Sequence, residues 1–70
     1  MTTTHTIKKT VGSLEVKGVV RSDDNGCKVH VTVSSIRPDG SVVPTMEFSR
    51  RVGVIAANVA FAIATKDVGK

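Results

Sequence analysis

The 70-residue chain lacks most of the residue types that supply catalysis, cross-linking or base stacking. It has one cysteine, two histidines, no tryptophan or tyrosine, and two phenylalanines. A single cysteine cannot form an intramolecular disulfide, and one cysteine with two histidines is a poor ligand set for a structural zinc ion. We therefore expect no cofactor, no metal site and no enzymatic activity.

The few residues with reactive side chains are also poorly spaced for a site. Cys27 and His30 have C-x-x-H spacing, but an odd separation along a strand sends two side chains to opposite faces. Asp23 and Asp24 lack the alternating oxygen donors and distal glutamate of a calcium loop. His5 lies in the N-terminal tail, and no serine, histidine and carboxylate form a recognisable triad. A symmetric intermolecular bridge through Cys27 remains open.

The sequence predicts neither a secretory signal nor a membrane span. Its first residues, MTTTHTIKK, contain no apolar core, and the apolar run from Val52 to Ala64 is interrupted by Asn58 and shorter than the roughly 20 residues that cross a bilayer. A lone thiol suits a reducing compartment. We expect a cytoplasmic protein without membrane contact.

Its length allows one small domain, residues 1–70. A domain of this size buries little more than half of the surface that its unfolded chain exposes, so a monomer is marginally stable. Because neither disulfides nor a metal supplement the core, we expect association with a second copy of the chain.

Two segments alternate between apolar and polar residues, which predicts strands. Residues 1–10 are either partly disordered or an edge strand. From Leu14 onward, Val16, Gly18 and Val20 fall on one face. Asn25-Gly26 is a strong hairpin signal and leads into a second strand, 27–36, with Val29, Val31 and Val33 facing inward. A tip at Asn25-Gly26 places Val20 opposite Val31.

A third strand is expected at about 42–48, after a turn at residues 37–40. A four-residue loop or a bulge would pair the inward valines with Met46 and Phe48 and so keep the apolar faces together, and we predict the four-residue loop. Pro44 cannot donate to a ladder, which predicts an edge strand or a bulge. The middle strand is then 27–36.

The long apolar segment from Ser49 to Lys66 predicts a helix. Ser49 serves as its N-cap, the end lies near Lys66 or Asp67, and Gly69 follows as a stop. At about 100° per residue, the bulky side chains that fall on one stripe and face the sheet are those of Val52, Ile55, Val59 and Ile63. The predicted fold class is α+β, a three-stranded antiparallel meander with a possible fourth N-terminal edge strand, followed by one helix on one face of the sheet.

Beside the bulky stripe lies a second stripe, composed mainly of small residues. Small residues let two helices approach closely, so we expect an antiparallel helix pair across a two-fold axis. The expected interface consists of Gly53, Val54, Ala56, Ala57, Ala60, Phe61 and Ala64. The alternative is an exposed, alanine-rich helix face.

The formal charge of +4 permits an anionic partner. Arg50 and Arg51 would occupy the first helical turn, where cations are disfavoured by the helix dipole, and two guanidinium groups there suit a phosphate or a carboxylate. The alternative is that Glu47 neutralises one arginine and water solvates the other. We expect the binding surface to join these two arginines to the turn at residues 37–40, which contributes Arg37 and Asp39. The remaining candidates lie on the outward sheet face: Lys17, Arg21, Lys28 and His30.

These features predict a small, non-catalytic, homodimeric binding or regulatory protein, such as an inhibitor or accessory protein, whose partner is another protein. The alternative is a basic nucleic-acid- or nucleotide-binding module that uses the helix N-terminus and the polar sheet face. The two phenylalanines are both assigned to buried positions, and the lack of exposed aromatics counts against single-strand binding by base stacking.

Overall fold

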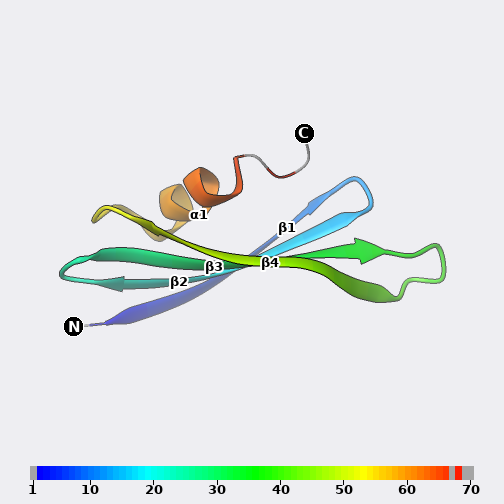
Figure 1. Cartoon of the computed structure of the whole chain (residues 1–70), viewed down its shortest axis with the longest axis horizontal. Coiled ribbons are helices and arrows are strands. Elements are labelled where there is room, and N and C mark those ends of the chain that lie inside the picture. Colours follow the sequence, from blue (N-terminus) through cyan, green and yellow to red (C-terminus); the bar gives the residue numbers. More distant parts are fainter. Residues whose placement is uncertain (1, 67, 69–70) are drawn as a thin grey trace.

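A computed structural model describes residues 2–66 and 68, and shows one antiparallel sheet with a short C-terminal helix over one face (Figure 1). The elements are β1 (Thr3–Val11), β2 (Leu14–Asp23), β3 (Gly26–Ile36), β4 (Val42–Val52) and α1 (Ala57–Thr65). The strand order in the sheet is β1-β2-β3-β4. The expected α+β meander is confirmed, with four strands and the N-terminal segment as the fourth.

The N-terminal segment forms an edge strand because Gly12 and Ser13 make a tight turn. Val11 pairs with Leu14 across this two-residue loop, and Gly12 adopts a positive φ of 59°, which glycine tolerates without steric cost. A Gly-Ser pair between two alternating runs is itself a hairpin signal. The alternative of disorder therefore does not hold for residues 3–10.

The β2–β3 hairpin turns one residue earlier than expected. Asp23 pairs with Gly26, so the loop is Asp24 and Asn25, and Val20 lies opposite Val29 rather than Val31. The Asp23 carboxylate accepts a hydrogen bond from the Asn25 backbone N–H at 2.8 Å, which fixes the turn at this position. A pairing shift of two residues leaves every side chain on its predicted face.

The β3–β4 pairing sets the inward valines against Met46 and Phe48 as predicted, but through a bulge and not through the expected four-residue loop, since Ile36 pairs with Val42 across five residues. Val31 pairs with Phe48 and Val33 with Met46, after which the register shifts so that Ser34 pairs with Pro44. The extra residue, Thr45, donates a hydrogen bond from its hydroxyl to the Val33 carbonyl at 3.0 Å. As Pro44 predicted, β4 is an edge strand.

The predicted start of the helix at Ser49 is wrong. Residues 49–52 continue β4, since β3 begins at Gly26 and Val52 pairs with Cys27 at that end of the ladder. The Ser49 hydroxyl bonds to the His30 ring and caps no helix. The helix starts at Ala57 with no side-chain cap and ends at Thr65. The other expected landmarks, Asp67 and Gly69, lie outside the described residues.

The helix packs on the sheet with the small-residue stripe and not with the bulky stripe that was predicted to face it. Ala60, Phe61 and Ala64 are buried against the sheet, whereas Val59 and Ile63 remain 45% and 42% exposed. The sheet makes room for the Phe61 ring at Gly18, because a Cβ at position 18 would lie 2.3 Å from Cδ1 of the ring. The small helix residues that were expected to contact a second helix therefore contact the chain's own sheet, where Gly18 leaves the space.

The core lies between the helix and β2 and β3. The three valines of β3 that were predicted to face inward are all buried, together with residues of β2 and the helix. The buried apolar set is Val16, Val20, Cys27, Val29, Val31, Val33, Ala60, Phe61 and Ala64. Among the described residues, no helix lies on the other face of the sheet (Figure 1). The polar side chains that β2, β3 and β4 direct to that side therefore form an open surface.

Candidate functional site: the open sheet face

The two arginines that sequence analysis placed at a helix N-terminus lie in β4. Arg51 pairs with Lys28 on the open face, while Arg50 pairs with Val29 on the helix face and places its guanidinium 5.6 Å from the centroid of the Phe48 ring. The expected anion site at a helix N-terminus is therefore wrong. One of the two arginines instead joins a different cluster.

Three cations stand in one row across three neighbouring strands of the open face. Arg21 of β2 pairs with Lys28 of β3, and Lys28 pairs with Arg51 of β4. All three residues are exposed. Like charges directly opposite each other destabilise a sheet by about 0.2–1 kcal/mol per pair. This cationic row (Arg21, Lys28, Arg51) is the most concentrated positive charge on the sheet.

Within the described part of the chain, no ion pair joins the cationic row to a carboxylate. The three cations line a hollow of about 280 Å³ together with Thr2 and Asp23. The Asp23 carboxylate accepts a hydrogen bond from Asn25 within the hairpin turn. A bound anion would therefore relieve the mutual repulsion of the row.

A second hollow, of about 340 Å³, adjoins the row. It is lined by Thr4, Val19, Arg21, Lys28, His30 and Ser49. Its walls offer the Thr4 hydroxyl beside two cations. Phosphate oxygens accept hydrogen bonds from such groups.

His30 is held in place on both sides of its ring. Nδ1 lies 2.8 Å from the Ser49 hydroxyl, and Nε2 lies 2.6 Å from Oε1 of Glu47. The Glu47 carboxylate is thus paired with His30 rather than with an arginine. These two contacts fix the His30 ring beside the cationic row.

Lys17 lies further along the same face, away from the row. It pairs with Lys8 of β1 and with Thr32 of β3, and Lys8 is 4.0 Å from the Glu15 carboxylate. Charges of both signs mix here. The cations are therefore concentrated at the Asp23–Gly26 end of the sheet.

The turn at residues 37–41 lies at the opposite end of the molecule from Arg50 and Arg51 (Figure 1). β4 spans Val42–Val52, 11 residues, or about 35 Å of extended chain. The predicted surface that joined these arginines to Arg37 and Asp39 does not exist. Asp39 instead closes its own turn, because it accepts hydrogen bonds from the Ser41 hydroxyl and backbone N–H at 2.7 and 2.9 Å. These bonds, the hydroxyl first, lower the pKa of the Asp39 carboxyl.

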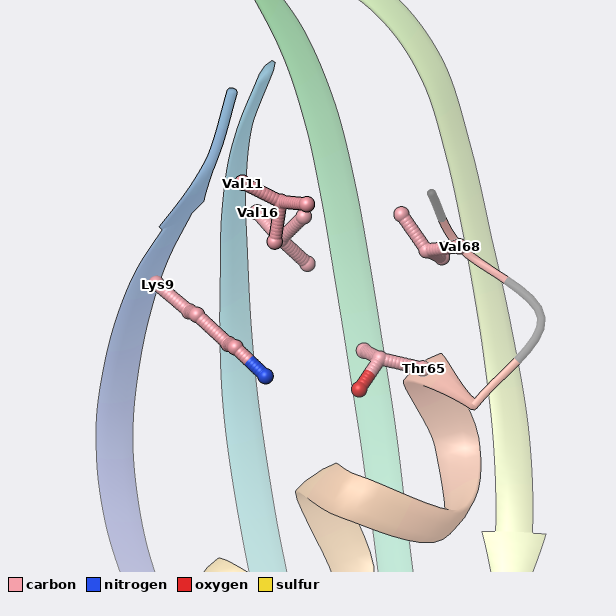
Figure 2. A pocket seen from close by; sticks show the side chains of 5 residues that line it. All are labelled: Lys9, Val11, Val16, Thr65 and Val68. Atoms are coloured by element: carbon pink, nitrogen blue, oxygen red, sulfur yellow. The ribbon is translucent and has the colours of Figure 1, made fainter. Parts of the chain in front are cut away.

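A small cavity on the helix side offers little room for a ligand. Lys9, Val11, Val16, Thr65 and Val68 line about 30 Å³ between the end of the helix and the β1–β2 hairpin (Figure 2). This volume suits one water molecule. No group of three or more histidine, cysteine, aspartate or glutamate side chains is placed to hold a metal among residues 2–66 and 68.

The predicted helix–helix interface is not available as expected. Ala60, Phe61 and Ala64 belong to the core of their own chain, and Gly53 and Val54 lie in the connection between β4 and the helix. Of the remaining two, Ala56 is the N-cap residue and Ala57 the first residue of the helix. The small-residue stripe packs on the sheet.

Cys27 is also buried, at 2% exposure, and its thiol lies 3.4 Å from the Ile55 carbonyl oxygen. As predicted from their spacing, Cys27 and His30 lie on opposite faces of the sheet. A thiol packed in this way is not presented to a second chain.

No protein-family model, curated protein or solved structure matches the chain. Among the helices of the described residues, none has the length and hydropathy to span a membrane.

Sequence reasoning found Arg21, Lys28 and Arg51 individually but missed their alignment. Continuing the strand pattern from Glu47 through Ser49 to Arg51 would have revealed it.

Proposed function

We propose that this chain is a small, non-catalytic, cytoplasmic binding protein that holds the phosphate backbone of a nucleic acid on its open sheet face. The observation that carries this proposal is the cationic row, three exposed cations on three adjacent strands. Repulsion between the three cations lowers the free energy of unfolding, and a bound polyanion would remove this repulsion.

The chemistry of the face indicates backbone contact without base reading. Both phenylalanines lie on the helix side, since Phe61 is buried and Phe48 packs against the same core. The open face therefore carries no phenylalanine, tyrosine or tryptophan to serve as the usual stacking platform for bases. The binding is therefore sequence-tolerant and dominated by counterion release.

Salt titration of an oligonucleotide complex tests the proposal. Three phosphate contacts predict a slope of log K against log salt of about −2.7 for duplex DNA and about −2.1 for a single strand. Fluorescence anisotropy with labelled oligonucleotides of mixed sequence, from low to moderate salt, measures this slope.

Charge-neutral variants then locate the site. Arg21→Gln or Lys28→Gln should each lower the magnitude of the duplex slope by about 0.9. Lys9→Gln is the matched control, because it removes the same charge from an exposed strand position on the helix face. Equal losses in the control and in Lys28→Gln, or no binding at low salt, would refute the proposal.

A protein partner with an acidic surface is the second candidate. Exposed apolar residues favour it, above all Val54, which is 72% exposed in the connection before the helix. Retention of an acidic protein, combined with indifference to oligonucleotides at low salt, would establish this candidate in place of the first.

A further inference from the structure

We propose that two copies of the chain pair antiparallel along β4, about a two-fold axis at Ser49, and so join their sheets into one continuous sheet. This inference concerns association and does not rest on nucleic-acid binding. It begins with the two edges of the sheet, β1 and β4.

The two edges differ in their ability to pair with themselves. β1 reads TTHTIKKTV and has two lysines but no acidic residue, so no register of a β1–β1 pair provides an ion pair. Lysines on an edge strand oppose such pairing. β4 reads VVPTMEFSRRV and carries both a carboxylate and two guanidinium groups. Most of its residues are exposed, which shows that the helix leaves the strand largely uncovered.

The bulge selects which part of β4 can pair. Pro44 lacks an N–H, and Thr45 is the extra residue of the bulge. From Met46 to Val52 the ladder with β3 is regular. Residues directly opposite across an antiparallel pair share a face. The axis that uses the whole regular segment is at Ser49, its midpoint.

Charge complementarity selects the same axis. With the axis at Ser49, Glu47 of one copy lies opposite Arg51 of the other on the open face, and this ion pair occurs twice by symmetry. An axis at Glu47 would bring two carboxylates together. An axis at Phe48 would set Arg51 against Thr45 and leave the charges unmatched.

The helix face agrees with this register. Met46, which is 48% exposed, lies opposite Val52 of the second copy and gains an apolar neighbour. Phe48 lies opposite the second copy's Arg50, a contact of the kind that Arg50 and Phe48 already make within one chain. Both faces of the paired strands are therefore complementary, and the unpaired backbone groups of the edge gain partners.

Disulfide trapping tests the axis directly. In Ser49→Cys the two new thiols face each other, with Cα atoms about 4.5–5.5 Å apart, within the range of a disulfide. Mild oxidation should convert this variant to a covalent dimer on a non-reducing gel. Val42→Cys is the matched control, since Val42 is exposed, lies outside the paired segment, and its two copies stand more than about 40 Å apart in this register. The native thiol, buried at Cys27, should remain uncrosslinked.

A charge swap provides an independent measurement in sedimentation equilibrium. Glu47→Arg and Arg51→Glu should each raise the dimer dissociation constant about tenfold or more, because both symmetric pairs become repulsive. The double variant E47R/R51E should restore dimerisation. Circular dichroism confirms that each variant folds.

Three outcomes would overturn the proposal. The first is a monomeric native chain at about 100 µM, well above the dissociation constants of stable dimers. The second is equal crosslinking of Ser49→Cys and Val42→Cys. The third is a double charge variant that dimerises no better than the single ones.

Discussion

The contact between Gly18 and Phe61 predicts that one methyl group on β2 displaces the helix. In Gly18→Ala the new Cβ would lie 2.3 Å from Cδ1 and 2.4 Å from Cε1 of Phe61. Carbon atoms in contact stand about 3.5–4.0 Å apart, so the ring has to retreat by more than about 1 Å. The ring is only 5% exposed, and overpacking of this kind costs about 1–3 kcal/mol.

This cost is large for so small a domain. At about 0.05–0.15 kcal/mol per residue, 70 residues have a total stability of about 3.5–10 kcal/mol. Urea unfolding followed by circular dichroism measures the loss, since the chain has no tryptophan or tyrosine to report by fluorescence. Gly53→Ala is the control, because nothing lies within 4 Å of a Cβ there, and its free energy of unfolding should change by less than about 1 kcal/mol.

A double-mutant cycle isolates the mechanism. Phe61→Val removes the ring atoms that the new methyl group would meet. In that background Gly18→Ala should stabilise the strand by about 0.5–1 kcal/mol, the ordinary advantage of alanine over glycine. The coupling energy is then about 1.5–4 kcal/mol. Equal effects of Gly18→Ala in both backgrounds would refute the role assigned to the ring.

Three further predictions concern the turns and the helix. Gly26→Ala should lower the free energy of unfolding by about 1–3 kcal/mol, because Gly26 has a φ of 133° and a Cβ there would lie 2.6 Å from the carbonyl oxygen that ends β4; a urea midpoint equal to that of the native chain would contradict this. In an NMR titration the pKa of the Asp39 carboxyl should lie below the ordinary value for aspartate, with the hydrogen bonds from Ser41 as the cause. Because the folded pKa is the lower one, the stabilisation of this turn is present above the unfolded pKa and is lost as pH falls through the folded pKa; a titration unchanged in Ser41→Ala would contradict this. Val59→Lys should be tolerated and Ala60→Lys should unfold the protein, since these residues are 45% and 0% exposed; circular dichroism compares them, and the reverse order would show that the helix packs by its bulky face.

The sheet was largely predictable because its signals are local. Alternation at Val29, Val31 and Val33 identified the inward face, and the need to match Met46 and Phe48 to that face identified their partners, although a bulge and not a four-residue loop produces the match. A one-residue error in the position of the turn left the faces correct, because the side-chain period of a strand is two.

The helix was less predictable because its evidence was not local. The segment from Ser49 to Val52 has no pattern that separates a strand from a helix, and its state depends on β3 needing a partner as far as Cys27. The buried face of the helix depends on Gly18, a residue some 40 positions away in the sequence. Helical periodicity alone favoured Val59 and Ile63, since it measures bulk and contains no information about the shape of the opposing surface.

The candidate site was hard to predict for the same reason, because it too depends on contacts between distant parts of the chain. Arg21, Lys28 and Arg51 were each visible as outward cations or as part of an arginine pair, but their alignment follows from two registers that only the folded sheet defines. A helix assignment at Arg51 removed it from the row.

The helix is short in relation to the sheet that it covers. Its 9 residues extend about 13.5 Å, whereas the molecule is 42 Å long. Amide hydrogens near the fully buried Val29 and Val31 should exchange with solvent only through global unfolding, and those flanking the 37–41 turn through local opening of the hairpin end. The protein therefore has a gradient of cooperativity along its strands, and the cationic row lies toward the end of the sheet away from that turn.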